Sequence, residues 1–275
     1  MPYDLSSISF ALTLILLHVQ LISMNKIQLY SYPTSPYAQK VACYLYYKNI
    51  DFDFIPVNPI NNEQIKFTNQ RQVPVLKIDN EWRKESSELG KWLEALFPQN
   101  PILPEHEQQL KSVLEVDHWI SNSLIPSYFR NAVEWQNTWN SITNGWRLAR
   151  AVSNATPLPF YIRFIWPFAV KRAGFIVDMV HNLNLNESFK DMNHRLQKEF
   201  IAHLKNGPFL CGHDQPSLAD LSAFPIITSS HFMGMKSKQS LLQHPEIKRW
   251  AQRVHNHLPN NPLLVPIELL NTTEL

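Results

Sequence analysis

The sequence has few cysteines and no cluster of like charges. Only two of its 275 residues are cysteine, Cys43 and Cys211, and neither belongs to a C-x-x-C or cysteine–histidine cluster. We therefore expect neither a disulfide framework nor a metal site, and we interpret His255 and His257 as surface residues. The 25 Lys and Arg nearly balance the 23 Asp and Glu, so nothing suggests a nucleic-acid partner.

A long apolar run is also missing, except near the start. Residues 8–22, ISFALTLILLHVQLI, are shorter than the about 20 residues of a membrane span. No Lys or Arg precedes them, unlike a secretory signal. Residues 1–23 are thus an upstream extension of a protein starting at Met24, a weak membrane anchor, or a cleaved export signal. We expect a cytoplasmic protein, with membrane association through residues 8–22 as the alternative.

From Lys26 the hydrophobic pattern alternates between strand and helix periods. It predicts strands from Ile27, over 52–57, 75–78 and 81–83, and helices over 38–48, over 62–68 and up to Phe97. After a proline-rich linker, strand signals disappear and helices follow. We predict an α/β domain over 24–97, a linker over 98–105, an all-α domain over 106–258, and a tail over 259–275 that packs irregularly on the surface.

Ser35 lies between the first strand and the first helix, directly before Pro36. Pro36 favours a helix start, where free N–H groups and the helix dipole stabilise a thiolate. The Ser35 hydroxyl can donate a hydrogen bond to such a thiolate. The alternative is a simple helix N-cap.

Two further segments carry binding groups. The Val73–Pro74 bond, which follows Gln72, is a candidate for the cis form. A cis bond would leave the Val73 backbone free to pair with an extended peptide. The alternative is an ordinary trans proline at the start of a strand. Glu85 can pair with an ammonium group and Ser86, at a helix start, can bind a carboxylate; the alternative is a capping box. A thioredoxin-like fold brings these two segments and Ser35 to one edge.

These segments resemble the glutathione S-transferase superfamily. VPVLKIDNEWRKES, from Val73 to Ser86, is similar to the family's VP-to-ES stretch, and LYSYPTSPYAQKVACYL has its order of strand, active-site residue and helix. The omega class has C-P-F-A where S-P-Y-A stands here, and the theta class has a catalytic serine at that distance. The segment 207–224 resembles the C-terminal signature, in which Ser217 and Asp220 form a capping box with a role in folding.

A nearer likeness is to the prostaglandin E synthase type 2-like branch, which shares V-N-P, I-K-F and V-P at Val57, Ile65 and Val73. Its C-P-x-C is replaced by SPYA at residues 35–38. Both redox sulfurs are absent, which puts chemistry that needs a thiolate nucleophile of the enzyme in doubt.

The resemblance implies a thioredoxin-like domain, an all-helical C-terminal domain and a homodimer. It implies that glutathione is the co-substrate and that its thiolate attacks a small apolar electrophile. Ser35 is then catalytic, and glutathione is held by Tyr37, Gln72, Val73, Pro74, Glu85 and Ser86. Tyr37 and Tyr32 are reserve candidates for the role of Ser35. The alternatives are a non-catalytic binding protein of this fold and a membrane-associated prostaglandin-synthase-like isomerase, with membrane contact only if the leader is retained.

Eight aromatic residues crowd the middle of the chain: Trp135, Trp139, Trp146, Phe160, Tyr161, Phe164, Trp166 and Phe168. We expect them to build the core of the helical domain. A pocket for the electrophile is one alternative, and a membrane-surface patch flanked by Arg163, Lys171 and Arg172 is another. We expect both cysteines to be structural.

Overall fold

The computed structural model describes residues 26–275 apart from 134–137, 170–173, 182, 206 and 237–239. Its N-terminal part holds a four-stranded sheet in the order β2-β1-β3-β4. β1 pairs in parallel with β2 and antiparallel with β3, which pairs antiparallel with β4. The elements are β1 (Ile27–Ser31), α2 (Pro36–Tyr47), β2 (Asp53–Pro56), the 3-10 helix η1 (Glu63–Thr68), β3 (Val75–Ile78), β4 (Glu81–Lys84) and α3 (Ser86–Leu96).

The two faces of the sheet bury different side chains, because successive strand residues point to opposite sides. Ile27, Leu29 and Ile78 belong to the main core, which also contains the buried faces of α2 and α3. Tyr30 and Val75 form a smaller cluster with residues of η1 on the other face. This order of strands and helices is the predicted thioredoxin-like arrangement.

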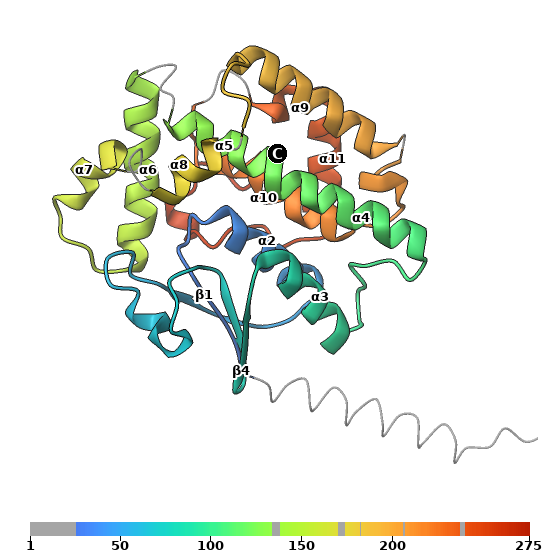
Figure 1. The fold of residues 1–275 in the computed structure, drawn as a ribbon, viewed down its shortest axis with the longest axis horizontal. Coiled ribbons are helices and arrows are strands. Elements are labelled where there is room, and N and C mark those ends of the chain that lie inside the picture. Colours follow the sequence, from blue (N-terminus) through green and yellow to red (C-terminus); the bar gives the residue numbers. More distant parts are fainter. Residues whose placement is uncertain (1–25, 134–137, 170–173, 182, 206, 237–239) are drawn as a thin grey trace, which may run out of the picture.

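The second half of the described chain is helical, as predicted. Its helices are α4 (Glu107–Trp119), which continues through a π-helical turn (Ile120–Leu124) into α5 (Ile125–Val133), then α6 (Thr138–Ala155), α7 (Ile162–Ala169), α8 (Gly174–His181), α9 (Phe189–Leu204), α10 (Leu218–Phe232) and α11 (Pro245–His255), with short 3-10 helices at Leu210–Gly212, Leu241–Gln243 and Ile267–Leu269. Figure 1 shows these helices as a layer above the sheet, with α2 and α3 between. The limits of the two domains stay predictions.

α10 lies at the centre of the helical layer and is buried along nearly its whole length. It packs on α2, where the Tyr44 hydroxyl and the Ser222 hydroxyl are 2.6 Å apart. It also approaches α3 closely, since a Cβ on Gly90 would lie 2.3 Å from the Leu218 side chain. A larger residue at position 90 would require the Leu218 side chain to move. The tail is mostly irregular, as predicted, but it also buries residues 263–265 in the core.

The prediction that the central aromatic residues build the core is wrong for most of them. Exposed side chains include Trp139, Trp146, Phe160, Tyr161, Phe164 and Phe168, whereas Trp166 is half-buried and Trp135 lies outside the described residues. The core positions of α6 are instead taken by Ala149, Ala151 and Val152. These small side chains allow neighbouring helices to approach, and the large rings remain on the outer side.

The apolar leader at residues 1–23 lies outside the described part of the chain. Among the helices that the structure does describe, none combines the length and the apolar character that crossing a membrane requires.

His255, the last residue of α11, is half-buried among aromatic rings of the helical core, so its interpretation as a surface residue is wrong. Its ring stacks on Phe224 with centroids 5.9 Å apart and contacts Phe232 at 5.4 Å. Burial lowers the pKa of His255 below its ordinary value of 6.5, although hydrogen bonds to the backbone oppose this shift. The folded state therefore favours the neutral ring.

We expect the free energy of unfolding to fall as the pH drops below about 6.5, because the unfolded chain then takes up a proton that folded His255 resists. Above that pH both states hold the neutral ring, and its contribution to stability is complete. Urea unfolding at several pH values between 7.5 and 5.5 measures the slope. His255→Gln should flatten it, whereas the exposed His106→Gln is the matched control. Equal slopes in the two variants would contradict the prediction.

Candidate functional site

Three strands end or begin at the same edge of the sheet. The register pairs Tyr30 of β1 with Val75 of β3, and Val75 in turn with Lys84 of β4. The chain therefore leaves β1 toward Ser35, enters β3 from Val73 and leaves β4 toward α3 at one common edge. The structure thus brings together the three segments that the sequence singled out. Their assignment to a ligand stays a prediction.

Ser35 is the N-cap of α2, as predicted, with Pro36 in the first turn. Its hydroxyl oxygen accepts a long hydrogen bond of 3.4 Å from the backbone N–H of Ala38. No hydrogen bond within the described residues uses the Ser35 hydroxyl as a donor. The side chain is half-buried, so its proton is available to a ligand at the positive end of the helix.

The Val73–Pro74 bond is cis, which settles the alternative left open by the sequence. Pro74 is buried and Val73 is half-buried. Within the described chain, neither the N–H nor the carbonyl of Val73 takes part in a backbone hydrogen bond. The exposed Gln72 differs, because its side-chain oxygen accepts a bond of 3.0 Å from the Lys84 ammonium group. The Val73 backbone can therefore pair with a ligand without first losing a hydrogen bond, whereas the Gln72 side chain cannot.

Glu85 and Ser86 lie where β4 passes into α3. Glu85 is exposed and has a positive φ of 68°, and it makes no side-chain cap to the helix. The capping-box alternative is therefore not formed here. Ser86 is buried at the first position of α3, where the N–H groups have no partner inside the helix. An acid and a helix N-terminus thus stand side by side at the edge.

Tyr37 and Tyr32 are both engaged with other side chains. The Tyr37 hydroxyl donates to the Met179 sulfur of α8 at 3.2 Å, and the Tyr32 hydroxyl donates to Asn62 at 3.0 Å. Burial raises the pKa of Tyr37, and the charge of Glu85 adds to the rise. Burial also raises the pKa of Tyr32. Both phenols stay protonated at neutral pH, but each already donates its proton to another side chain, so they are weaker candidates than Ser35 for contact with a thiolate.

Sequence reasoning missed a buried charged network beneath this edge. Lys40 of α2 forms an ion pair of 2.8 Å with Asp117 of α4, and both side chains are almost fully shielded from solvent. The Lys40 ammonium group also donates to Ser121 at 2.9 Å, while Asp117 accepts from the hydroxyls of Ser87 and Ser222. The available signal was a lysine directly before the apolar run from Val41 to Leu45.

This network fixes the start of α3 because Ser87 follows Ser86 directly. Burial lowers the pKa of Lys40, and the Asp117 carboxylate opposes that shift. The pair joins α2, α3, α4 and α10 through one carboxylate. It therefore positions the two helix N-termini that meet at the site.

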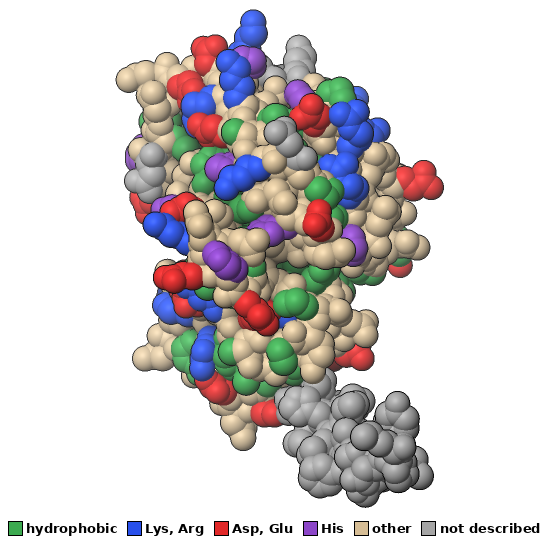
Figure 2. All heavy atoms as spheres, turned by 90° about the vertical axis from the view of Figure 1, so that its right-hand side faces the viewer, with side chains coloured by type: hydrophobic (Ala, Val, Ile, Leu, Met, Phe, Trp, Pro, Cys, Tyr) green, Lys and Arg blue, Asp and Glu red, His purple; other side chains and the backbone are tan. Residues whose placement is uncertain are grey.

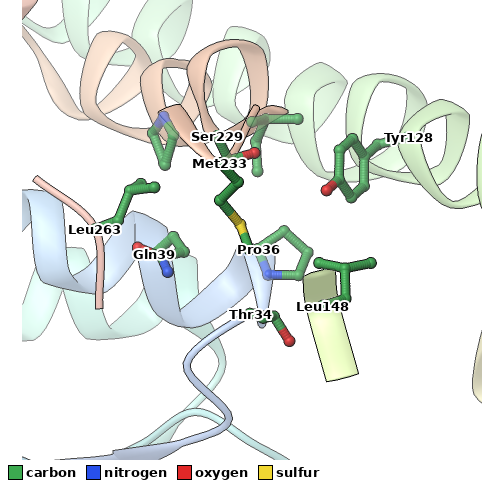
Figure 3. Close-up of a pocket in the computed structure, with 10 residues that line it drawn as sticks. Thr34, Pro36, Gln39, Tyr128, Leu148, Ser229, Met233 and Leu263 are labelled. Atoms are coloured by element: carbon green, nitrogen blue, oxygen red, sulfur yellow. The ribbon is translucent and has the colours of Figure 1, made fainter. Parts of the chain in front are cut away.

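A small cavity lies beside Ser35 on the side of the helical domain. Its walls come from α2, α5, α6, α10 and the tail, and include Thr34, Pro36, Leu148, Met233 and Leu263. Figure 3 shows the Met233 side chain extending toward Pro36 across this space. Its volume is about 20 Å³, enough for one or two water molecules. Pockets for small organic ligands measure roughly 300–1,000 Å³, so this cavity does not hold an electrophile.

Neither cysteine is placed as a reactive group. Cys43 is fully buried in α2, and burial raises the pKa of its thiol far above the ordinary range. Burial also raises the pKa of Cys211 to about 11, with the charge of Asp220 adding to the rise. In the part of the chain that the structure describes, no group of three or more His, Cys, Asp or Glu is arranged to hold a metal ion.

Asp220 lies in the capping box that the sequence predicted. With Ser217 it forms a capping box at the start of α10. Its carboxylate also accepts from the backbone N–H of Leu210 and from the Trp250 indole, both at 2.8 Å. Four hydrogen bonds and complete burial leave no oxygen atom for a substrate.

A thioredoxin-like domain with this sheet edge, followed by an all-helical domain, defines the class of protein. The N-terminal domain family of glutathione S-transferases matches residues 29–101, and the C-terminal domain family matches residues 159–257. Together these matches cover more than half of the chain. The chain belongs to the glutathione S-transferase superfamily.

Individual relatives are distant. Prostaglandin E synthase 2 of Danio rerio is 19% identical over 268 residues, which are 83% of this chain and 70% of that protein. The Mus musculus protein of the same name is 22% identical over 292 residues, with 88% and 73% covered. Human glutathione transferase theta-2, solved in complex with glutathione and an unknown ligand, has a TM-score of 0.56 at 17% identity and covers 84% of this chain and 82% of that chain. This structural similarity shows the fold.

Proposed function

We propose that this chain binds glutathione along the common edge of β1, β3 and β4 and conjugates its thiolate to an apolar electrophile. The observation that carries the proposal is the register that aligns Tyr30, Val75 and Lys84 across three neighbouring strands. Neighbouring strands lie roughly 4.8 Å apart, so the distance from β1 to β4 is about 10 Å. An extended tripeptide also spans about 10 Å, at about 3.3 Å per residue.

Each end of the tripeptide meets suitable chemistry in this arrangement. The free Val73 backbone pairs with the central cysteinyl residue as a short added strand. The N–H groups at Ser86 receive the γ-glutamyl carboxylate, and Glu85 receives its ammonium group. Pro74 fixes the start of β3, and Lys84 supplies a nearby positive charge that sequence reasoning missed. Gln72 borders the same place, but its backbone N–H and carbonyl are both bonded to the Gln70 side chain, so its contribution is smaller than that of Val73.

The reaction needs a thiolate and correct positioning. The Ser35 hydroxyl donates a hydrogen bond to the glutathione sulfur, and the start of α2 adds the favourable end of a helix dipole. Both lower the pKa of the bound thiol. The thiol proton is released to solvent, and the sulfur forms a C–S bond to the electrophilic carbon as the leaving group, a halide ion in the case of an aryl halide, departs. No covalent enzyme intermediate is formed. Tyr37 borders the same place and remains the reserve donor.

A non-catalytic glutathione-binding protein is the second candidate, and the cavity beside Ser35 favours it. This cavity of about 20 Å³ is too small for an electrophile, which would have to approach the glutathione sulfur from the open surface. A prostaglandin-synthase-like isomerase has less support, since residues 35–38 hold no cysteine. A homodimer in the cytoplasm is what the family implies, and light scattering of the purified chain tests the dimer.

Replacing Ser35 by alanine is expected to lower turnover by about 10- to 100-fold, the effect of losing one hydrogen bond to a charged group. Glutathione binding, measured by calorimetry, should weaken much less, because the contacts at Val73 and Glu85 remain. Conjugation of a model aryl halide measures the turnover.

Ser188→Ala is a matched control, because Ser188 caps α9 in the same way, accepting from Asp191 N–H at 3.1 Å. Both variants should lose about 1 kcal/mol of stability through the missing cap. Only Ser35→Ala should lose turnover. Equal turnover in both would remove Ser35 from the mechanism, and glutathione binding without turnover in the unmodified protein would favour the second candidate.

A further inference from the structure

An exposed aromatic surface occupies the outer side of α6, of the turn before α7 and of α7 itself. It consists of Trp139, Trp146, Phe160, Tyr161 and Phe164, which are between 40% and 77% exposed. The two tryptophans contact each other at 6.5 Å, and Phe160 contacts Tyr161 at 6.0 Å. At roughly 150–250 Å² per aromatic side chain, on the order of 500 Å² is left in water. This total, summed over the two ring pairs and Phe164, is comparable to the largest apolar patch of an ordinary monomer, which is often functional.

This surface does not line the cavity beside Ser35. Leu148 is the α6 residue in the wall of that cavity. At about 100° per helix residue, Leu148 points away from both Trp139 and Trp146, at about 180° and 160°. The tryptophans therefore face outward, and their role is separate from that of the glutathione site.

α7 is fixed against α6 by a close approach. A Cβ on Gly145 would lie 2.8 Å from Pro167, which is buried. With Pro167 turned toward α6, the rings of Phe160, Tyr161 and Phe164 remain in solvent. Figure 1 shows α7 as the outermost element at the edge of the molecule that lies opposite α9 and α11. The surface is thus accessible from outside the molecule.

The charge of this region differs from that of the rest of the chain. Residues 135–177 contain five Lys and Arg and no Asp or Glu, whereas the remaining residues carry 20 basic and 23 acidic side chains. The exposed Arg150 lies on the same face of α6 as Trp146, one helical turn away. On the face turned away from α7, by contrast, Figure 2 shows acidic and basic side chains interspersed.

We propose that the α6–α7 aromatic surface docks on a lipid bilayer that carries anionic headgroups. Tryptophan, tyrosine and phenylalanine prefer the membrane–water interface, and basic residues without neighbouring acids are attracted to anionic lipids. A second copy of this chain is a poorer occupant, because it would bring an equally basic region against this one.

The test is flotation of the full-length chain with vesicles of phosphatidylcholine, with and without phosphatidylserine. We expect binding that needs phosphatidylserine and weakens with salt. Phe160→Ser/Phe164→Ser should reduce the partition coefficient more than about tenfold, and Arg150→Glu should reduce it about tenfold. Both sites are exposed, so circular dichroism should show an unchanged fold.

Ile60→Ser is the matched control, since Ile60 is an equally exposed apolar residue of the α/β domain. It should leave binding unchanged. Every variant keeps residues 1–23, so the leader contributes equally to all.

Vesicles with brominated acyl chains should quench the fluorescence of Trp139 and Trp146, and Trp139→Phe should remove part of that quenching. Equal binding of Phe160→Ser/Phe164→Ser and the unmodified chain overturns the proposal. The proposal is also overturned if Phe160→Ser/Phe164→Ser dissociates a dimer and leaves vesicle binding unchanged.

Discussion

Lys40→Met is expected to destabilise the protein by about 3–5 kcal/mol, because it leaves the carboxylate of Asp117 buried without a counter-charge. The Lys40 and Asp117 side chains are 0% and 3% exposed, so water does not replace the lost ammonium group. The remaining donors to Asp117, the hydroxyls of Ser87 and Ser222, do not neutralise it. Urea unfolding followed by circular dichroism measures the change.

Lys91→Met is the matched control for this experiment. Lys91 forms a pair with Glu88 of the same length, 2.8 Å, but both side chains are exposed. Its loss should change stability by less than about 1 kcal/mol. The double variant Lys40→Met/Asp117→Leu should recover most of the loss, because it removes both buried charges. A single Lys40→Met variant as stable as the control would show that the network does not hold these helices.

Asp220→Ala is expected to cost at least about 4 kcal/mol, since it leaves several buried donors without an acceptor. The carboxylate accepts from the N–H groups of Leu210 and Ser217, from the Ser217 hydroxyl and from the Trp250 indole. These bonds join the 3-10 helix Leu210–Gly212, the start of α10 and α11. Their loss should therefore loosen the whole helical domain and lower the cooperativity of thermal unfolding.

Asp214→Ala provides the control, because Asp214 lies in the same signature segment but is exposed. It should leave the midpoint of unfolding within about 1 °C of the unmodified protein, as for an ordinary surface substitution. If Asp220→Ala kept its stability and instead lost conjugation activity, the assignment of Asp220 to folding would be wrong. Thermal unfolding and the conjugation assay on the same samples decide this.

Local patterns predicted the secondary structure well. The alternation at Ile27 and Leu29 predicts β1, Pro36 predicts the start of α2, and the turn at Asp79 and Asn80 predicts the hairpin of β3 and β4. Each of these signals acts over a few residues, through side-chain periodicity or a fixed backbone angle. They do not depend on the distant chain.

Burial of the aromatic residues was predicted wrongly, for a physical reason. A ring on a helix is apolar whether it faces the core or the outside, and its sequence neighbours do not decide which. In α6, the small residues Gly145, Ala149 and Ala151 occupy the packed face, so Trp139 and Trp146 are turned outward. The close approach of Pro167 to Gly145 is a contact between two helices and has no local signal.

The sequence by itself determined the order of strands and helices, the helix N-cap at Ser35 and the capping box of Ser217 and Asp220, because each of these depends on residues near one another in the chain. Only the tertiary structure decided which groups lie around the candidate site. It also decided between the cis and trans forms of the Val73–Pro74 bond, which the sequence left open. The pairing of Lys40 with Asp117 and the small volume of the cavity beside Ser35 depend on packing between distant segments, because the energy of such contacts is set when those segments meet.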